Sequence, residues 1–211
     1  MTGGISALTV ALEKAAVAVK SEHEGIPDVV LVVGGPGEGR VHGHFAPKRW
    51  ESRDDEQVAV HEIMLAGESF KRGGEATFGT LVHELAHAYC DANDIQDTSN
   101  RGRYHNANFK KVANEFGLDI EKADTIGWSV THVPDETVER YRDVIGPIDA
   151  AIKAYRKVDY VSKTPAKKSA KWFMVCPECQ DPAPIGKKWF MQQAEAPYCR
   201  THDEHYELEQ Q

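Results

Sequence analysis

The sequence has no apolar run that approaches the roughly 20 residues needed to span a membrane. No basic segment precedes the first apolar residues, and Glu13 and Lys14 interrupt that stretch, so the pattern of a secretory signal peptide is also missing. The first absence argues against a membrane-spanning helix and the second against secretion, so we expect a cytoplasmic protein without a membrane partner.

The sequence also has fewer basic than acidic residues. Lys and Arg number 25 against 33 Asp and Glu, and the formal net charge is -8. A uniformly acidic surface repels nucleic acid, so any nucleic-acid binding must come from a local basic patch. Hydrophobic residues make up 41% of the 211 residues, which is enough for one sizeable core and a small appended module.

Cysteine is scarce, with four in the chain. Cys90 stands alone near the end of an apolar helical pattern, which is typical of a small buried thiol. Cys176, Cys179 and Cys199 lie close together in the sequence. In a reducing compartment such clustering indicates metal binding rather than disulfides.

Hydrophobic periodicity predicts an α+β fold. Helices are expected where apolar residues recur at helical spacing, at residues 5–19, 75–92, 106–116 and 135–158. Strands are expected where apolar and β-branched residues dominate, at residues 28–33, 41–45 and 58–65. The glycine-rich residues 34–39 suggest a hairpin turn, and Gly146-Pro147 should break or kink the last helix.

Composition divides the chain into three parts. Residues 1–160 carry the helical and strand patterns of a main domain. Residues 161–171 are rich in Lys, Ala, Ser and Thr, as a flexible basic linker would be. Residues 172–211 are short and aromatic and hold three of the four cysteines, which suggests a separate small module.

His83, Glu84 and His87 form an HExxH motif. Two histidines four residues apart lie on one face of a helix, so both imidazoles can reach one zinc ion. Glu84 would take a proton from a water that zinc activates and pass it to the leaving amine. The alternative is a chance match on a surface helix, but the apolar stripe of residues 75–92 favours a true metal site.

A catalytic zinc needs a third protein ligand and an open position. We choose His105 at the start of the next helix, because the intervening loop of residues 91–102 lets that helix fold back. His61 and His132 are the alternatives. The same two histidines and Tyr104 are unranked candidates for stabilising the oxyanion.

The cysteines near the end of the sequence suggest a second metal site. Cys176 and Cys179 form one pair, and Cys199 and His202 repeat its spacing. Two such pairs on hairpins give a closed structural zinc site of zinc-ribbon type. His205 competes with His202 as fourth ligand. A redox pair is the alternative for the first two cysteines, but no βαβ pattern surrounds them.

These residues resemble the SprT-like (Spartan-type) metallopeptidases. The resemblance is carried by residues 80–88, by His105 followed by Phe109 and Lys110, and by the linked ribbon. It implies a zincin-like fold, a small sheet packed with helices around the HExxH helix. His83, His87 and His105 match the family's zinc ligands and Glu84 its catalytic base. Two departures are Asn106, where glycine is common, and His202, where cysteine is common.

The resemblance also implies proteolysis linked to DNA, chiefly of proteins trapped on it. Basic and aromatic residues near the ribbon would serve single-stranded or distorted DNA, through charge and through stacking on bases. Solvated lysines and a small aromatic core are the alternative reading of the same residues. The candidates for DNA contact are Lys163, Lys167, Lys168, Lys171, Trp172, Lys187, Lys188 and Trp189.

The leading hypothesis is therefore a DNA-associated zinc endopeptidase with one catalytic and one structural zinc ion, acting on a protein substrate. One rival is a metallopeptidase that cleaves a specific regulator such as a repressor. Another is a non-catalytic, DNA-binding or transcription-associated zinc protein. On the substrate side, residues 58–65 could form an edge strand that binds an extended peptide, or an ordinary core strand.

Overall fold

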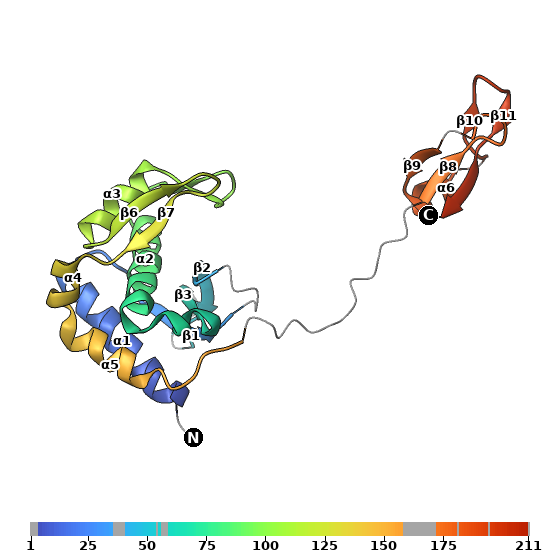
Figure 1. Cartoon of the computed structure of the whole chain (residues 1–211). Coiled ribbons are helices and arrows are strands. Elements are labelled where there is room, and N and C mark those ends of the chain that lie inside the picture. The colour runs from blue at the N-terminus through green and yellow to red at the C-terminus, as the bar shows by residue number, and fades with distance from the viewer. Residues whose placement is uncertain are drawn as a thin grey trace. The chain divides into compact units, whose positions relative to one another are not determined.

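The computed structural model describes residues 4–35, 41–53, 55, 59–157, 172–180, 182–193 and 195–210. The chain forms two compact units, Met1–Val161 and Ser162–Gln211, here called unit 1 and unit 2 (Figure 1). Both mix helices with small sheets, in agreement with the expected α+β class. Within the described residues, no helix has both the length and the apolar character needed to cross a membrane.

The first sheet of unit 1 has three strands in the order β1-β3-β2. They are β1 (Val29–Gly34), β2 (Gly43–Glu51) and β3 (Ala59–Ala66). β3 pairs with β1 in parallel and with β2 in antiparallel fashion. The predicted hairpin between the first two strands is therefore wrong, because β3 lies between them. Val58 and residues 36–40 lie outside the described residues.

Helix α2 (Gly74–Ala92) runs through the middle of unit 1. In Figure 1, α1 (Gly4–Glu22) and α5 (Arg142–Ala151) lie on one side of it and the first sheet on the other. A 3-10 turn, η1 (Gly67–Arg72), leads into α2, and the Asp149 carboxylate accepts a hydrogen bond of 2.7 Å from the Gly74 N–H. The apolar stripe of α2 is fully buried, which fixes the helix in the core. Its members are Phe78, Leu81, Val82, Leu85 and Ala86.

A second sheet of unit 1 has the strand order β4-β5-β7-β6. The strands are β4 (Thr98–Ser99), β5 (Tyr104–His105), β6 (Asp119–Ala123) and β7 (Gly127–His132). Gly127 has a φ of 75°, and a Cβ there would lie 2.2 Å from the His105 carbonyl oxygen. Only glycine allows β5 and β7 to approach so closely.

Helix α3 (Ala107–Glu115) follows β5 and packs beside this sheet. From α3, Lys110 places its Nζ 4.0 Å from the centroid of the Trp128 ring in β7. Lys122 of β6 lies 5.8 Å from the same centroid. The indole therefore makes a cation–π contact with each of two ammonium groups.

The last helical region of unit 1 is divided in two. Helices α4 (Asp135–Arg140) and α5 (Arg142–Ala151) meet at Tyr141, which has φ −104° and ψ 16°. Of the predicted break or kink at Gly146-Pro147, the break is wrong, since Pro147 lies inside α5, and the kink stays a prediction. Tyr141 is buried with its ring 5.0 Å from that of Phe78, so core packing sets the turn between the two helices.

Unit 2 is small and has little apolar interior. An antiparallel sheet has the order β12-β8-β9, and a two-stranded ladder joins β10 to β11. Its elements are β8 (Trp172–Val175), β9 (Pro182–Ile185), α6 (Lys187–Met191), β10 (Tyr198–Cys199), β11 (Glu204–His205) and β12 (Glu207–Gln210). In the described part of this unit, the buried apolar residues are Val175, Cys176 and Cys199.

Candidate metal centres

Three histidines of unit 1 come together around one point. His83 and His87 lie one turn apart on α2, and His105 reaches them from β5. One ring nitrogen from each lies within 4.8 Å of those of the other two. The Nε2 atoms of His87 and His105 are 3.0 Å apart. Such a group of imidazole nitrogens could hold a metal ion.

The other ring nitrogen of each histidine is already hydrogen-bonded. Partners of this kind fix the tautomer and the orientation of a metal-binding imidazole. The three Nδ1 contacts are His83 to Thr131 Oγ1 at 2.9 Å, His87 to Asp97 Oδ2 at 2.5 Å, and His105 to the Ile126 carbonyl at 3.2 Å. Each histidine thus keeps its Nε2 available to a metal, and those of His87 and His105 face each other.

Asn106 holds His105 in place. As the N-cap of α3, its side chain accepts hydrogen bonds from the N–H groups of Asn108 at 2.8 Å and Phe109 at 3.3 Å. Its amide also donates to the Gln96 carbonyl at 2.8 Å. Asn106 thus ties the start of α3 to the loop that carries Asp97.

Phe109 forms an apolar floor beneath the cluster. Its fully buried ring has its centroid 4.4 to 4.7 Å from those of His83, His87 and His105. Burial, followed by the two neighbouring imidazoles, holds the pKa of His83 well below its ordinary value. Burial and His87 also lower the pKa of His105. Both rings are therefore neutral near pH 7, as metal ligation requires.

Glu84 is the acidic group beside the histidines. Burial raises the pKa of its carboxyl to about 7, and the charge of His87, followed by a hydrogen bond from the Phe45 backbone N–H, opposes that rise. The side chain lies against Gly43 of β2, where an added Cβ would be 2.7 Å from Glu84 Oε1. A carboxylate that is buried and poised near neutral pH is suited to moving protons.

The alternative third ligands lie elsewhere. His61 Nδ1 accepts a hydrogen bond of 3.3 Å from the Lys48 N–H and lies 3.7 Å from an Asp91 oxygen. His132 is exposed, with its Nε2 3.8 Å from Glu121. The Tyr104 ring packs against Gly127. Among the described residues, the histidine cluster therefore includes His105 and neither of the other two histidines.

Sequence reasoning missed two residues of this site, Asp97 and Thr131. Both act through a histidine and not on the metal, and neither has a fixed spacing from the HExxH motif. Ligating histidines commonly donate their second N–H to a carboxylate. That rule could have directed attention to the acidic residues in the loop between His87 and His105, of which Asp97 is one.

The second cluster lies in unit 2. The ligand atoms of Cys176, Cys179, Cys199 and His202 all lie within 4.8 Å of one another and could bind a metal ion. His202 Nδ1 is 3.8 Å from the Cys176 sulfur and 3.7 Å from that of Cys199. His205 is turned to the Ala196 carbonyl, 2.7 Å from its Nδ1. The structure therefore gathers His202 and not His205.

Two similar turns build this cluster. After the first cysteine pair, Gln180 has a φ of 57° and its N–H donates to the Cys176 carbonyl at 2.9 Å. After the second pair, Asp203 has a φ of 58° and its N–H donates to the Cys199 carbonyl at 3.0 Å. The repeated spacing in the sequence thus corresponds to a repeated turn. All the cysteines are free of disulfides.

The electrostatics of this cluster favour thiolate. The side-chain hydrogen bond with His202, followed by backbone N–H groups, lowers the pKa of Cys199 to about 6. A thiol with such a pKa is largely deprotonated near pH 7, and the thiolate is the form that binds metals.

The candidate nucleic-acid residues are only partly described. Lys163, Lys167, Lys168 and Lys171 lie outside the described residues. The Trp172 ring is covered by Lys187, whose Nζ is 4.1 Å from its centroid. Lys188 is exposed, and Trp189 is 52% exposed.

No protein-family model, curated protein or solved structure matched this chain in the comparisons made. The functional interpretation therefore depends on the geometry of the two clusters and on the chemistry of their side chains.

Proposed function

We propose that the chain is a zinc-dependent endopeptidase of the SprT-like type, with a zincin-like catalytic domain in unit 1 and a zinc ribbon in unit 2. One observation carries this proposal. Three imidazoles converge with each Nδ1 already bonded, next to the buried carboxylate of Glu84.

The donor set of unit 1 fits zinc in a catalytic role. His83, His87 and His105 would hold it, and three protein ligands leave one position of a tetrahedral ion open. When bound, zinc supplies Lewis acidity, which lowers the pKa of a water to about 7 and polarises a substrate carbonyl. The Cys3His group of unit 2 fits a closed, structural zinc site instead.

Glu84 would carry the proton during peptide cleavage. Its carboxylate accepts the proton from the attacking water and then donates it to the nitrogen of the leaving amine. The Phe45 N–H holds the carboxylate in position through both steps. Asp97 and Thr131 keep two of the imidazoles oriented while the charge nearby changes.

The substrate strand is β2 and not β3. The proposed edge role of residues 58–65 is wrong, because β3 is the central strand of its sheet. Among the described strands, β2 pairs with β3 alone and packs beside α2. An extended peptide added to the free edge of β2 would pass Gly43 and so reach Glu84.

Unit 2 would bring the enzyme to DNA. Trp189 offers an exposed ring for base stacking, and Lys188 beside it supplies positive charge. Trp172 is a poorer platform because Lys187 covers its ring. This arrangement favours cleavage of proteins bound or crosslinked to single-stranded or distorted DNA.

Glu84→Gln in the full chain tests the proposal. The substrate is a protein crosslinked to a single-stranded oligonucleotide, and gel analysis measures cleavage. We expect cleavage to be lost while the zinc content stays at two ions per chain, with Glu13→Gln, at an exposed position of α1, as the matched control. Full biological activity of Glu84→Gln would instead favour a non-catalytic zinc protein.

Trp189→Ala separates the DNA-associated enzyme from a peptidase dedicated to one regulator. We expect it to lower the stimulation of cleavage by single-stranded DNA and to leave DNA-free cleavage of a peptide unchanged. If DNA has no effect on the wild-type enzyme, the dedicated regulator peptidase is the better description.

A further inference from the structure

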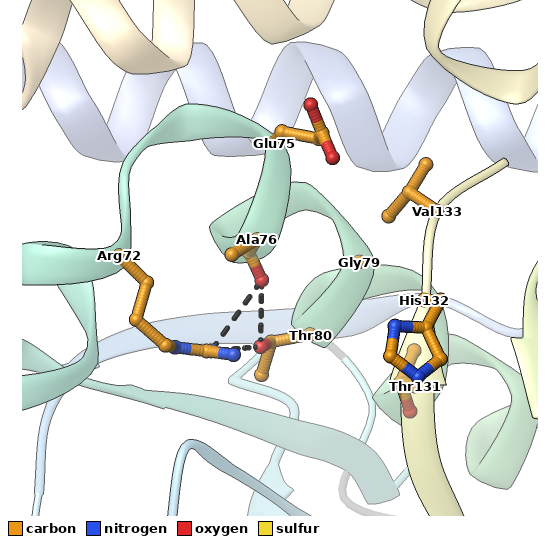
Figure 2. Close-up of a pocket in the computed structure, with 8 residues that line it drawn as sticks. All are labelled: Arg72, Glu75, Ala76, Gly79, Thr80, Thr131, His132 and Val133. Atoms are coloured by element: carbon orange, nitrogen blue, oxygen red, sulfur yellow. Dashed lines mark hydrogen bonds between the residues drawn. The ribbon is translucent and has the colours of Figure 1, made fainter. Parts of the chain in front are cut away.

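A cavity of about 220 Å³ lies beside the first half of α2 (Figure 2). Arg72 of η1, Thr80 of α2 and His132 of β7 are among the residues that line it. Pockets for drug-sized ligands occupy roughly 300–1,000 Å³, so this cavity is suited to a single side chain. We call it the Arg72 cavity.

The Arg72 cavity adjoins the histidine cluster through two of its lining residues, Thr80 and Thr131. Thr80 lies one helical turn before Glu84, which is about 6 Å along the helix axis. Thr131, which also lines the cavity, bonds to His83 Nδ1 at 2.9 Å. An extended peptide advances about 3.3 Å per residue. A peptide with its scissile bond at Glu84 would therefore place a side chain in the cavity one or two residues away.

Two hydrogen bonds hold the Arg72 guanidinium at the wall of the cavity. Its Nη2 donates to Thr80 Oγ1 at 2.7 Å and to the Ala76 carbonyl at 3.4 Å. Across the described part of the chain, no carboxylate forms an ion pair with it. A guanidinium has five N–H donors and favours a carboxylate as a two-pronged partner.

Two other ionisable groups line the cavity. Glu75 does so without pairing with Arg72, and it would repel an anion that approached from its side. His132 lies across from the guanidinium in Figure 2 and is 3.8 Å from Glu121. Arg72 is therefore the permanently charged cation of the cavity. The Glu75 carboxylate also lines the cavity but forms no ion pair with Arg72.

We propose that the Arg72 cavity binds a carboxylate of the substrate peptide, so that the enzyme prefers an acidic residue one or two positions from the cleaved bond. This inference rests on the proposed function and adds a substrate class to it. The carboxylate source is an Asp or Glu side chain. A C-terminal carboxylate has the same chemistry and is distinguished by the test.

The test uses internally quenched peptides whose C-termini are amidated, in which one Glu is moved through every position of a neutral sequence. Each peptide has a matched partner with Gln at that position. Mass spectrometry locates the cleaved bond, and kcat/KM is measured for the full-length zinc-loaded protein. We expect a Glu-to-Gln preference of about tenfold at one position next to the cleaved bond.

Charge reversal identifies the residue responsible. Arg72→Glu should invert the preference, so that Lys at that position is cleaved faster than Glu, and Glu75→Gln should enlarge the preference for Glu. Lys71→Glu, the same charge change on the exposed neighbouring residue, should leave the Glu-to-Gln ratio unchanged. Equal rates for all Glu and Gln peptides, or a ratio unmoved by Arg72→Glu, would overturn the proposal.

Binding measurements separate this inference from the proposed function. Fluorescence anisotropy with the Glu84→Gln protein measures peptide affinity without cleavage. If the wild-type protein cleaves no peptide but the Glu peptide binds more tightly than the Gln peptide, the proposed peptidase function is wrong and the carboxylate-binding role of the cavity stands. Preference restricted to peptides with a free C-terminus would assign the cavity to that carboxylate instead. Loss of oligonucleotide binding in Arg72→Glu, with no peptide preference, would make it a phosphate site.

Discussion

The two clusters of candidate metal ligands are held in place by very different surroundings. In unit 1 the histidines project from a buried helix and from a strand, over a floor of fully buried residues such as Leu85 and Phe109. In unit 2 the described apolar interior consists of Val175 and two of the candidate ligands themselves. Hydrophobic burial therefore positions the first cluster, whereas the second has little but its own ligands to hold it.

This difference matches two kinds of chemistry. A site shaped by a core can hold three ligands in place and leave a coordination position open for a reaction. A small unit without a core needs a metal to fold, and a closed set of four ligands serves that purpose. The sharpest ways to break the comparison are changes that affect one unit and should spare the other.

Metal removal should have the largest effect, and it should fall on unit 2. A structural zinc contributes about 10–16 kcal/mol of binding free energy near pH 7, which is folding free energy in a unit of this kind. We expect chelation, or Cys176→Ser, to abolish hydrogen-exchange protection in residues 172–210 while α1 and α2 stay protected. Cys90→Ser is the matched control, since Cys90 lies in unit 1 outside both clusters. Protection of unit 2 without metal would contradict the comparison.

Removing the floor of the first cluster should have the next largest effect. Phe109→Ala deletes a fully buried ring, and such a change costs about 3–5 kcal/mol of unfolding free energy. Denaturant unfolding should show this loss in unit 1 and none in unit 2. Phe190→Ala, which changes the partly buried residue of α6, should leave the transition of unit 1 unchanged. A stable Phe109→Ala protein would mean that the cluster does not depend on this core.

Asp97→Asn tests the support of a single ligand. The His87 Nδ1 would keep a hydrogen-bond acceptor but lose the negative charge, and changes of this kind weaken metal binding by about 10–100-fold. Competition with a chelating dye should show that loss for one zinc ion, with the ion of unit 2 unaffected. Asp94→Asn in the same loop is the control. Equal affinities for both variants would remove Asp97 from the site.

The smallest expected effect concerns the pH dependence of the stability of unit 1, through a histidine outside the metal-ligand cluster. Burial lowers the pKa of His23 below its usual 6.5. Glu22 and Glu115 act to raise this pKa, and Arg140 acts to lower it further. The unfolded chain then takes up this proton first, so stability falls as pH drops below 6.5. We expect the fall in Tm between pH 7 and 5.5 to be smaller in His23→Gln, by less than about 2 °C. An equal fall in both proteins would contradict this assignment.

Local spacing predicted the parts of the site that local structure determines. The HExxH pattern places His83 and His87 on one face whenever residues 75–92 form a helix, and the repeated cysteine spacing corresponds to a repeated turn. Asp97 and Thr131 were not predictable in this way, because the fold brings them to the histidines from separate segments. The helix division at Tyr141 and the central place of β3 depend likewise on packing between distant parts of the chain.

The place of Trp128 has a consequence for observing the protein. It follows Gly127, the residue paired with His105, and the His105 N–H donates to the preceding Ile126 carbonyl at 3.0 Å. A displacement of His105 is thus passed through the backbone to a fluorophore flanked by two ammonium groups. Unit 1 thus carries an intrinsic optical reporter, and in a protein whose other tryptophans are replaced the emission of this indole should follow occupancy of the histidine cluster without any attached dye.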